Sequence, residues 1–168
     1  MYELFRGAAL VAATVTAGLM AGLFYAFSIS VMTGLGRVDD RTFVTAMQRI
    51  NVAILNGWFA IAFGGALVFT VLAALLQLRG NGRSVLPWVA AAAVLYGVVL
   101  AITFVVNVPL NDQLEAAGPP DRIADLGSVR ERFEATWVRW NVVRTVVSTA
   151  AFGCLAWALV LYGRATAP

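Results

Sequence analysis

The 168-residue sequence contains no histidine and no lysine, and its single cysteine is Cys154. Without histidine, the chain has no imidazole metal ligand, no imidazole base and no Ser-His or Cys-His nucleophile. Without lysine, it can form neither a Schiff base nor a phosphate-binding P-loop, and one cysteine cannot form an intrachain disulfide or a CxxC redox pair. Many enzyme classes are therefore excluded before any motif is considered.

Charge is also scarce, because only 12% of the residues are charged whereas 61% are hydrophobic. A soluble domain has about 25% charged and roughly 45–50% apolar residues. Four stretches of 30, 29, 28 and 19 residues contain no charged side chain, namely Gly7–Gly36, Ile50–Leu78, Ser84–Asn111 and Thr145–Gly163. About 20 apolar residues suffice for a helix to cross a bilayer. The sequence therefore predicts an all-α fold, a single integral membrane domain over 1–168 with spans at about 7–33, 52–78, 86–108 and 142–163.

Local signals give the expected helix boundaries. We expect the first helix to be retained rather than cleaved as a signal peptide, and to end at Gly34-Leu35-Gly36. The pair Asp39-Asp40 predicts an N-terminal cap, followed by one continuous helix to Leu78. The third helix is expected to end at Pro109, and Ser128-x-x-Glu131 predicts a capping box that opens the fourth. The predicted architecture is an antiparallel four-transmembrane-helix bundle in which helices 2 and 4 extend beyond the membrane on one side.

Small residues recur at four-residue steps along the first helix, at Thr14, Gly18, Gly22, Ala26 and Ser30. Such a stripe lets helices approach closely in lipid, so we expect it to pack inside the bundle. The same kind of helix packing between two copies of the chain would give a homo-oligomer, which is a further possible partner.

The short second connection contains two glycines, an asparagine, Arg79 and Arg83, and no acid, which predicts a tight cytoplasmic turn. Both termini are then cytoplasmic as well, and eight of the nine acidic residues lie on the outer side. We expect a multi-pass protein of a bacterial plasma membrane. The net charge of +3 comes from scattered arginines rather than from a basic face, so nucleic acid is not an expected partner.

Polar residues near the ends of the spans gather at one end of an antiparallel bundle. They are Tyr25, Ser28, Arg49, Asn51, Asn56, Asn107, Asn111, Trp137, Arg139, Trp140, Asn141 and Arg144. Indole, amide and guanidinium groups together suit a flat aromatic ligand that carries oxygen atoms. The alternative is structural, since arginines snorkel, tryptophans line membrane interfaces and asparagines bridge helices.

A short pattern also occurs twice. Phe43-x5-Arg49-x-Asn51-Val52 matches Phe133-x5-Arg139-x-Asn141-Val142, in a composition biased enough to produce such a match by chance. If the pattern reflects a repeated helical hairpin, the two Arg-x-Asn pairs meet at the same membrane depth.

Four segments in this order resemble the DUF1772 family, also called the anthrone oxygenase family. They are Gly22-Leu-Phe-Tyr-Ala-Phe-Ser28, Ala46-Met-Gln-Arg-Ile-Asn51, Asn107-Val-Pro-Leu-Asn111 and Trp137-Val-Arg-Trp-Asn-Val-Val-Arg144. The resemblance covers nearly the whole chain and implies a small four-helix membrane protein. It further implies oxidation of polycyclic anthrones to anthraquinones by dioxygen with no evident cofactor. The chain departs from the family pattern at Gly57 and Thr33, where we would expect proline.

For such a reaction we expect catalytic roles for Arg144, Asn141, Arg139 and Tyr25, with the other eight polar residues binding substrate and with no bound metal or cofactor. Arg144 and Asn141 would donate hydrogen bonds to an enolate oxygen. The base would be Tyr25, a carboxylate near the membrane edge (Asp112, Glu131 or Glu134) or water. The expected partners are the lipid bilayer, a lipophilic aromatic molecule and O2.

Two other interpretations remain open. One is a membrane protein without enzymatic activity that binds a quinone-like or lipid ligand, or packs in a complex. The other is a metal enzyme that uses the acids between Asp112 and Glu134, although these alternate with arginines as on a solvated face.

Overall fold

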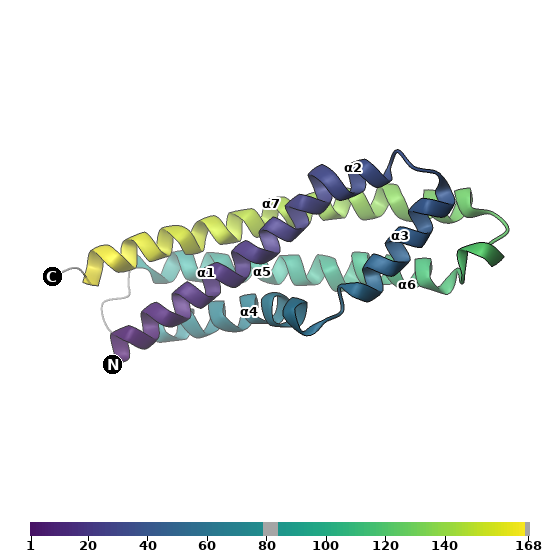
Figure 1. The fold of residues 1–168 in the computed structure, drawn as a ribbon. Coiled ribbons are helices and arrows are strands. Elements are labelled where there is room, and N and C mark those ends of the chain that lie inside the picture. The colour runs from purple at the N-terminus through teal and green to yellow at the C-terminus, as the bar shows by residue number, and fades with distance from the viewer. Residues whose placement is uncertain (79–83, 167–168) are drawn as a thin grey trace.

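The protein is an elongated bundle of four antiparallel helical rods (Figure 1). The computed structural model describes residues 1–78 and 84–166, and within them all regular secondary structure is helical. Four helical stretches are long and apolar enough to cross a membrane, namely Tyr2–Leu35, Gly57–Gln77, Leu86–Ala116 and Leu126–Thr166. The all-α, four-transmembrane-helix bundle is therefore confirmed, and it is compatible with a multi-pass membrane protein. The predicted turn of residues 79–83 lies outside the described residues.

The first rod consists of α1 (Tyr2–Ala26), the π-helical segment η1 (Phe27–Val31) and α2 (Met32–Leu35). It ends where the glycines predict. The small-residue stripe is buried only in its first half. A Cβ atom at Gly18 would lie 3.0 Å from the ring of Phe152, whereas one at Gly22 would meet nothing within 4 Å. The expectation of close packing is right near Gly18 and wrong from Gly22 onward, where Gly22, Ala26 and Ser30 are exposed.

The second rod is two helices, α3 (Asp40–Ala53) and α4 (Gly57–Gln77), so the prediction of one continuous helix to Leu78 is wrong. Asn56 causes the break. Its backbone is extended, its side-chain oxygen accepts from the N–H of Phe59 at 3.1 Å, and its side-chain amide donates to the carbonyl of Ala53 at 2.9 Å. One side chain thus ends α3 and caps α4, the positions where helices leave unpaired backbone groups.

The predicted cap of α3 is confirmed at Asp39. Its carboxylate accepts from the backbone N–H of Thr42 at 3.0 Å and from the hydroxyl of Thr42 at 2.7 Å. These hydrogen bonds favour the ionised carboxylate and hold the pKa of Asp39 below its ordinary value.

The third rod consists of α5 (Leu86–Ile102), the π-helical segment η3 (Thr103–Asn107) and α6 (Val108–Ala116). The prediction that Pro109 ends this helix is therefore wrong. Proline in a helix removes one N–H and collides with the carbonyl four residues earlier. Here that carbonyl belongs to Val105, inside the wider π-helical turn, which accommodates the proline while the helix continues.

The fourth rod follows the short helix η4 (Pro120–Arg122) and is a single helix, α7 (Leu126–Thr166). Its 41 residues span about 60 Å at 1.5 Å per residue, so the predicted extension beyond the membrane is confirmed. The predicted cap at Ser128 lies one turn after the observed start of α7. The backbone N–H of Ser128 donates to the carboxylate of Asp125 at 3.0 Å, which makes Asp125 the cap.

The part of the bundle that extends beyond the spans has its own apolar core. Phe43 and Phe133 meet edge to face with ring centroids 6.2 Å apart, and Met47 and Leu114 are fully buried beside them. Arg130 joins this region together: its guanidinium donates to the carbonyl of Val38 at 2.8 Å and pairs with Asp40 at 3.0 Å and Glu134 at 2.6 Å. The end of the bundle distant from the chain termini is thus a packed cap that fixes the spans beneath it.

Candidate functional site

A cavity of about 720 Å³ opens beside the break between α3 and α4. It lies between the end of α1, the break, η3 with the start of α6, and α7. Seven of the twelve polar residues chosen from the sequence line it, namely Asn51, Asn56, Asn107, Asn111, Trp137, Asn141 and Arg144. The bundle therefore brings polar residues from three rods to one cavity.

The other five residues lie outside the cavity wall: Tyr25, Ser28, Arg49, Arg139 and Trp140. Tyr25 is 53% exposed on the outer face of α1, and both arginines are exposed. Each arginine precedes a cavity asparagine by two residues, and two residues rotate a side chain by about 200° around a helix axis. An Arg-x-Asn pair on a helix therefore cannot direct both side chains into one cavity, and functional roles for these five remain predictions.

Arg144 is a buried cation of the cavity wall and is only 6% exposed. One terminal nitrogen donates to the side-chain oxygen of Asn141 at 2.8 Å and the other to the hydroxyl of Thr103 at 3.3 Å. The guanidinium carbon lies 4.4 Å from the ring centre of Phe24 and 5.5 Å from that of Trp137. Across the described ranges, no carboxylate pairs with this cation.

Asn141 holds Arg144 in place. Its amide nitrogen donates to the carbonyl of Phe24 at 3.0 Å and to the hydroxyl of Ser28 at 2.9 Å, which leaves its oxygen to accept from Arg144. The hydroxyls of Ser28 and Thr145 lie 3.0 Å apart and extend the network. Ser28 thus supports the site from behind, because α1 is fixed to α7 through these contacts.

Trp137 connects α7 to α6. Its indole N–H donates to the side-chain oxygen of Asn111 at 2.8 Å, and its ring stacks on Phe133 with centroids 5.9 Å apart. The amide nitrogen of Asn107 points to the backbone carbonyl of Trp137 at 3.5 Å. Asn107 therefore presents its side-chain oxygen away from that carbonyl.

Three buried polar atoms of the cavity wall have no hydrogen-bond partner: the amide nitrogen of Asn51, the side-chain oxygen of Asn107 and the Nε of Arg144. Leaving such a group unpaired costs about 1–3 kcal/mol, so native structures rarely do so without a reason. Two donors and one acceptor are thus unpaired in the wall of one cavity, although none of these three atoms is itself exposed to the cavity.

The rest of the wall is mostly apolar. Phe59 and Phe63 stack with ring centroids 5.1 Å apart, and Phe104 meets Phe63 edge to face. At the mouth, Leu55 is 78% exposed and Phe104 is 61% exposed. The candidate span of α4 begins at Gly57 and Phe104 belongs to the candidate span Leu86–Ala116, so these apolar side chains lie at or close to membrane-spanning segments. The cavity therefore has an opening suited to a lipophilic molecule.

Two carboxylates, Asp112 and Glu115, lie on the mouth of the cavity on α6. Sequence reasoning selected Asp112 but missed Glu115, although three residues along a helix bring side chains to one face. It also missed Thr103, one turn before Asn107 on the same rod. Of the other proposed bases, Glu131 lies outside the cavity wall and Glu134 is bound to Arg130.

Three of the other acids at this end form ion pairs. Asp40 and Glu134 pair with Arg130, and Asp121 pairs with Arg41. Among residues 1–78 and 84–166, no three His, Cys, Asp or Glu side chains gather as metal ligands would. The acidic segment is thus organised around arginines.

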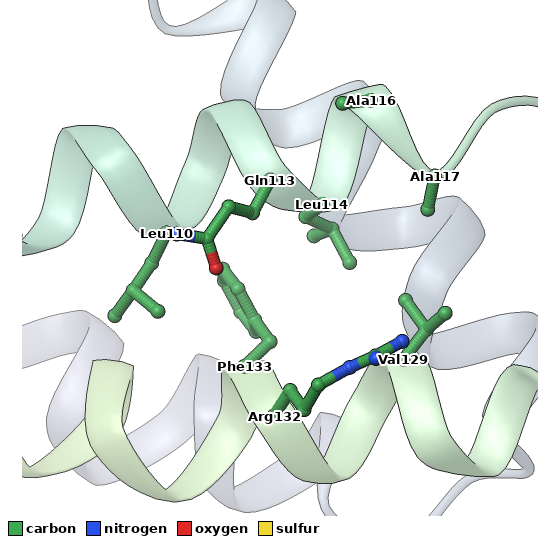
Figure 2. A pocket seen from close by; sticks show the side chains of 8 residues that line it. All are labelled: Leu110, Gln113, Leu114, Ala116, Ala117, Val129, Arg132 and Phe133. Carbon is green, nitrogen blue, oxygen red and sulfur yellow. The ribbon is translucent and has the colours of Figure 1, made fainter.

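A second, smaller cavity of about 370 Å³ lies between α6 and α7 (Figure 2). Leu110, Leu114 and Phe133 form its apolar side, and Gln113 and Arg132 lie at its exposed edge. It contains none of the unpaired buried atoms, so the larger cavity is the candidate site.

Comparison with known proteins supports the sequence resemblance. The family model described as "Anthrone oxygenase" matches residues 55–154, more than half of the chain. Two of the four segments that carry the resemblance, those at Asn107–Asn111 and Trp137–Arg144, lie inside the match. No curated protein and no solved structure matches the chain.

Proposed function

Because the chain belongs to the anthrone oxygenase family, we propose that it oxidises a lipophilic polycyclic aromatic ketone with O2 in the larger cavity. One observation carries this proposal: a buried arginine, which has no carboxylate partner among the residues that the structure describes, forms part of a mostly apolar cavity. Such a cation suits a ligand that becomes negatively charged during its reaction.

The reaction begins with an aromatic ketone that has a methylene carbon between two aromatic rings. Loss of one methylene proton gives an enolate, and the enolate transfers an electron to O2. The carbon radical and superoxide combine, the peroxide takes up a proton, and loss of water leaves a second carbonyl. One oxygen atom of O2 remains in the quinone and the other leaves as water.

Arg144 would stabilise the enolate oxygen. Neutral groups hold its guanidinium, because its terminal nitrogens donate to the amide oxygen of Asn141 and to the hydroxyl of Thr103. The cation therefore keeps its charge available for a ligand, and a low-dielectric cavity strengthens that interaction. Tyr25 and Arg139 are not part of the proposal, because their side chains lie outside the cavity.

The carboxylates at the mouth are the candidates for proton acceptors. Asp112 and Glu115 lie on the cavity wall, and the chain has no histidine to take this role. A proton released near the mouth would pass to one of them or to interfacial water.

The test is oxygen uptake by the detergent-purified, metal-stripped protein with a simple anthrone, after subtraction of spontaneous oxidation. Arg144→Gln should lower the rate about a hundredfold or more, the usual effect of removing an oxyanion donor. Asn141→Ala should lower it as well, because it releases Arg144 from its position. Arg132→Gln, an exposed arginine of the same helix, is the matched control and should keep the wild-type rate.

A second candidate function is binding of a quinone-like ligand without turnover. It is favoured by the position of the two carboxylates, which lie exposed at the mouth rather than beside Arg144. In that case, a quinone would bind in an Arg144-dependent manner while folded protein consumed no oxygen with any anthrone. This alternative is rejected if the wild type and the Arg132→Gln control consume oxygen with an anthrone whereas Arg144→Gln and Asn141→Ala do not.

A further inference from the structure

The orientation of the Asn111 side chain is set by Trp137. An indole N–H can only donate a hydrogen bond, so the side-chain oxygen of Asn111 must face it, as the 2.8 Å contact shows. The NH2 group of Asn111 then points away from the indole. Asn111 is half-buried in the cavity wall, its NH2 group is not enclosed as the amide nitrogen of Asn51 is, and no group in the described part of the chain accepts a hydrogen bond from it. Asn111 is therefore a wall residue with an accessible, unused donor.

The same indole relates this donor to Arg144, which lines the same cavity. The guanidinium carbon of Arg144 lies 5.5 Å from the ring centre of Trp137, and the oxygen of Asn111 lies 2.8 Å from the Nε1 of that ring. The cation and the amide are therefore separated by no more than one indole ring and two contact distances. Two carbonyl groups on opposite sides of one aromatic ring require donors at a similar separation.

The carboxylates of the mouth give the direction in which a ligand would lie. Glu115 follows Asn111 by one helical turn, so both residues are on the face of α6 that lines the cavity. In an aromatic ketone whose oxygen is bound by Arg144, the methylene carbon is on the opposite side of the central ring, toward α6. Its proton is then directed toward the mouth carboxylates, and an oxygen atom added at that carbon is directed toward Asn111.

We propose, on the basis of the function proposed above, that Asn111 donates a hydrogen bond to the oxygen atom that O2 adds to the methylene carbon. Arg144 binds the first oxygen of the ring system and Asn111 binds the second, so the cavity recognises both oxygens of a quinone. Asn111 is then a further catalytic residue, and it also determines specificity.

The hydrogen bond acts in the last step of the reaction. The carbon that carries the hydroperoxide loses its remaining proton to a carboxylate or to water at the mouth. The carbonyl forms as the O–O bond breaks, and the distal oxygen takes up a proton and leaves as water. The proximal oxygen remains on the carbon, where it accepts from Asn111. O2 is the only oxidant, and the proton that is released equals the proton that is taken up.

The test compares two stable tricyclic probes on the full-length protein under nitrogen, at one detergent concentration. Anthraquinone has two carbonyl groups on opposite sides of its central ring. Xanthone has the same shape and one carbonyl, but a ring ether oxygen, which is a weak acceptor, replaces the other. Binding is followed by quenching of tryptophan fluorescence. The wild type should bind anthraquinone about tenfold more tightly than xanthone, the expected effect of one hydrogen bond.

Asn111→Asp is the decisive variant, because a carboxylate still accepts from the indole of Trp137 but has no NH2 group to donate. It should abolish the preference for anthraquinone. Gln113→Glu adds the same charge to α6 at a residue that lies outside the larger cavity, and it should retain the preference.

Equal binding of the two probes by the wild type, or binding of neither, would overturn the proposal even if Asn111→Asp failed to fold. A second overturning result is an unchanged preference in folded Asn111→Asp. Binding is measured without turnover, so a preference that depends on Asn111 in a protein that consumes no oxygen would reject the proposed oxidation and keep the recognition of a quinone. Oxygen uptake without the preference would reject only the role of Asn111.

Discussion

Arg144 and Asn141 lie one turn apart on α7, and the guanidinium donates to the amide oxygen at 2.8 Å while the amide nitrogen bonds to α1. This pair fixes a cation inside the bundle through neutral partners alone. A carboxylate in place of the amide would have neutralised the charge. Asn141 therefore positions the charge of Arg144 without neutralising it, which lowers the stability of the fold. Stability measurements on variants can detect this cost.

Arg144→Gln should preserve or raise the melting temperature while activity is lost. A buried cation without a paired carboxylate retains a desolvation cost, and a neutral amide of similar length removes it. Thermal unfolding in detergent, followed by circular dichroism, measures the effect. A large fall in melting temperature would instead show that Arg144 serves to hold the helices together.

Arg130→Gln should show the opposite behaviour. This arginine binds Asp40, Glu134 and the carbonyl of Val38, and its removal leaves these groups without their partner. We expect a loss of about 2 kcal/mol in the free energy of unfolding. Arg132→Gln, two residues away and exposed, should change it by less than about 0.5 kcal/mol. Chemical denaturation of both variants provides the comparison, and equal effects would contradict the assigned role.

Gly57→Pro should stabilise the protein by about 0.4–1 kcal/mol. Gly57 is the first residue of α4, where proline fits because the backbone N–H has no helical partner, and Asn56 already has the extended backbone that precedes proline. The matched change Gly64→Pro, inside α4, should destabilise by about 3 kcal/mol. A destabilising Gly57→Pro would mean that the α3–α4 break differs from the one described.

Membrane orientation can be measured with single cysteines in a Cys154→Ser background. We propose that the packed cap lies outside the cytoplasm, because α4 ends and α5 begins at the other end and the sequence that connects these helices contains Arg79 and Arg83 and no acid. Ala124→Cys should then react with an impermeant maleimide on intact cells, and Thr166→Cys only after lysis. The reverse labelling pattern would invert the assigned orientation.

Sequence patterns were sufficient for the rods but not for their interruptions. Uncharged length predicts the four spans because the hydrocarbon layer requires it. Asn56-Gly57 is a turn signal, but the apolar residues on both sides of it favoured one continuous helix. The π-helical turn that accommodates Pro109 has no sequence signal of its own, so the proline alone predicted a helix end. Both interruptions lie beside the cavity, where α4 and η3 provide much of its wall.

The sequence predicts at which end of the bundle the candidate site lies. It does not predict which side chains point into the cavity. The repeated pattern illustrates this difference. Its phenylalanines meet in the cap, its arginines are exposed, and its asparagines line the cavity, in the pairs Phe43 and Phe133, Arg49 and Arg139, and Asn51 and Asn141. Matched positions thus occupy matched environments. Residue type gave the chemistry, whereas rotation around the helix axis determined which members could contribute.

We propose that the apolar mouth at Leu55 and Phe104 opens to the bilayer, which is then the solvent from which a ligand arrives. The relevant concentration is then moles of ligand per mole of lipid rather than per litre of buffer. Adding empty vesicles to a fixed amount of ligand would dilute it across more membrane and slow its capture, although nothing in the aqueous phase had changed. Affinities for this protein are therefore comparable only at a stated lipid content.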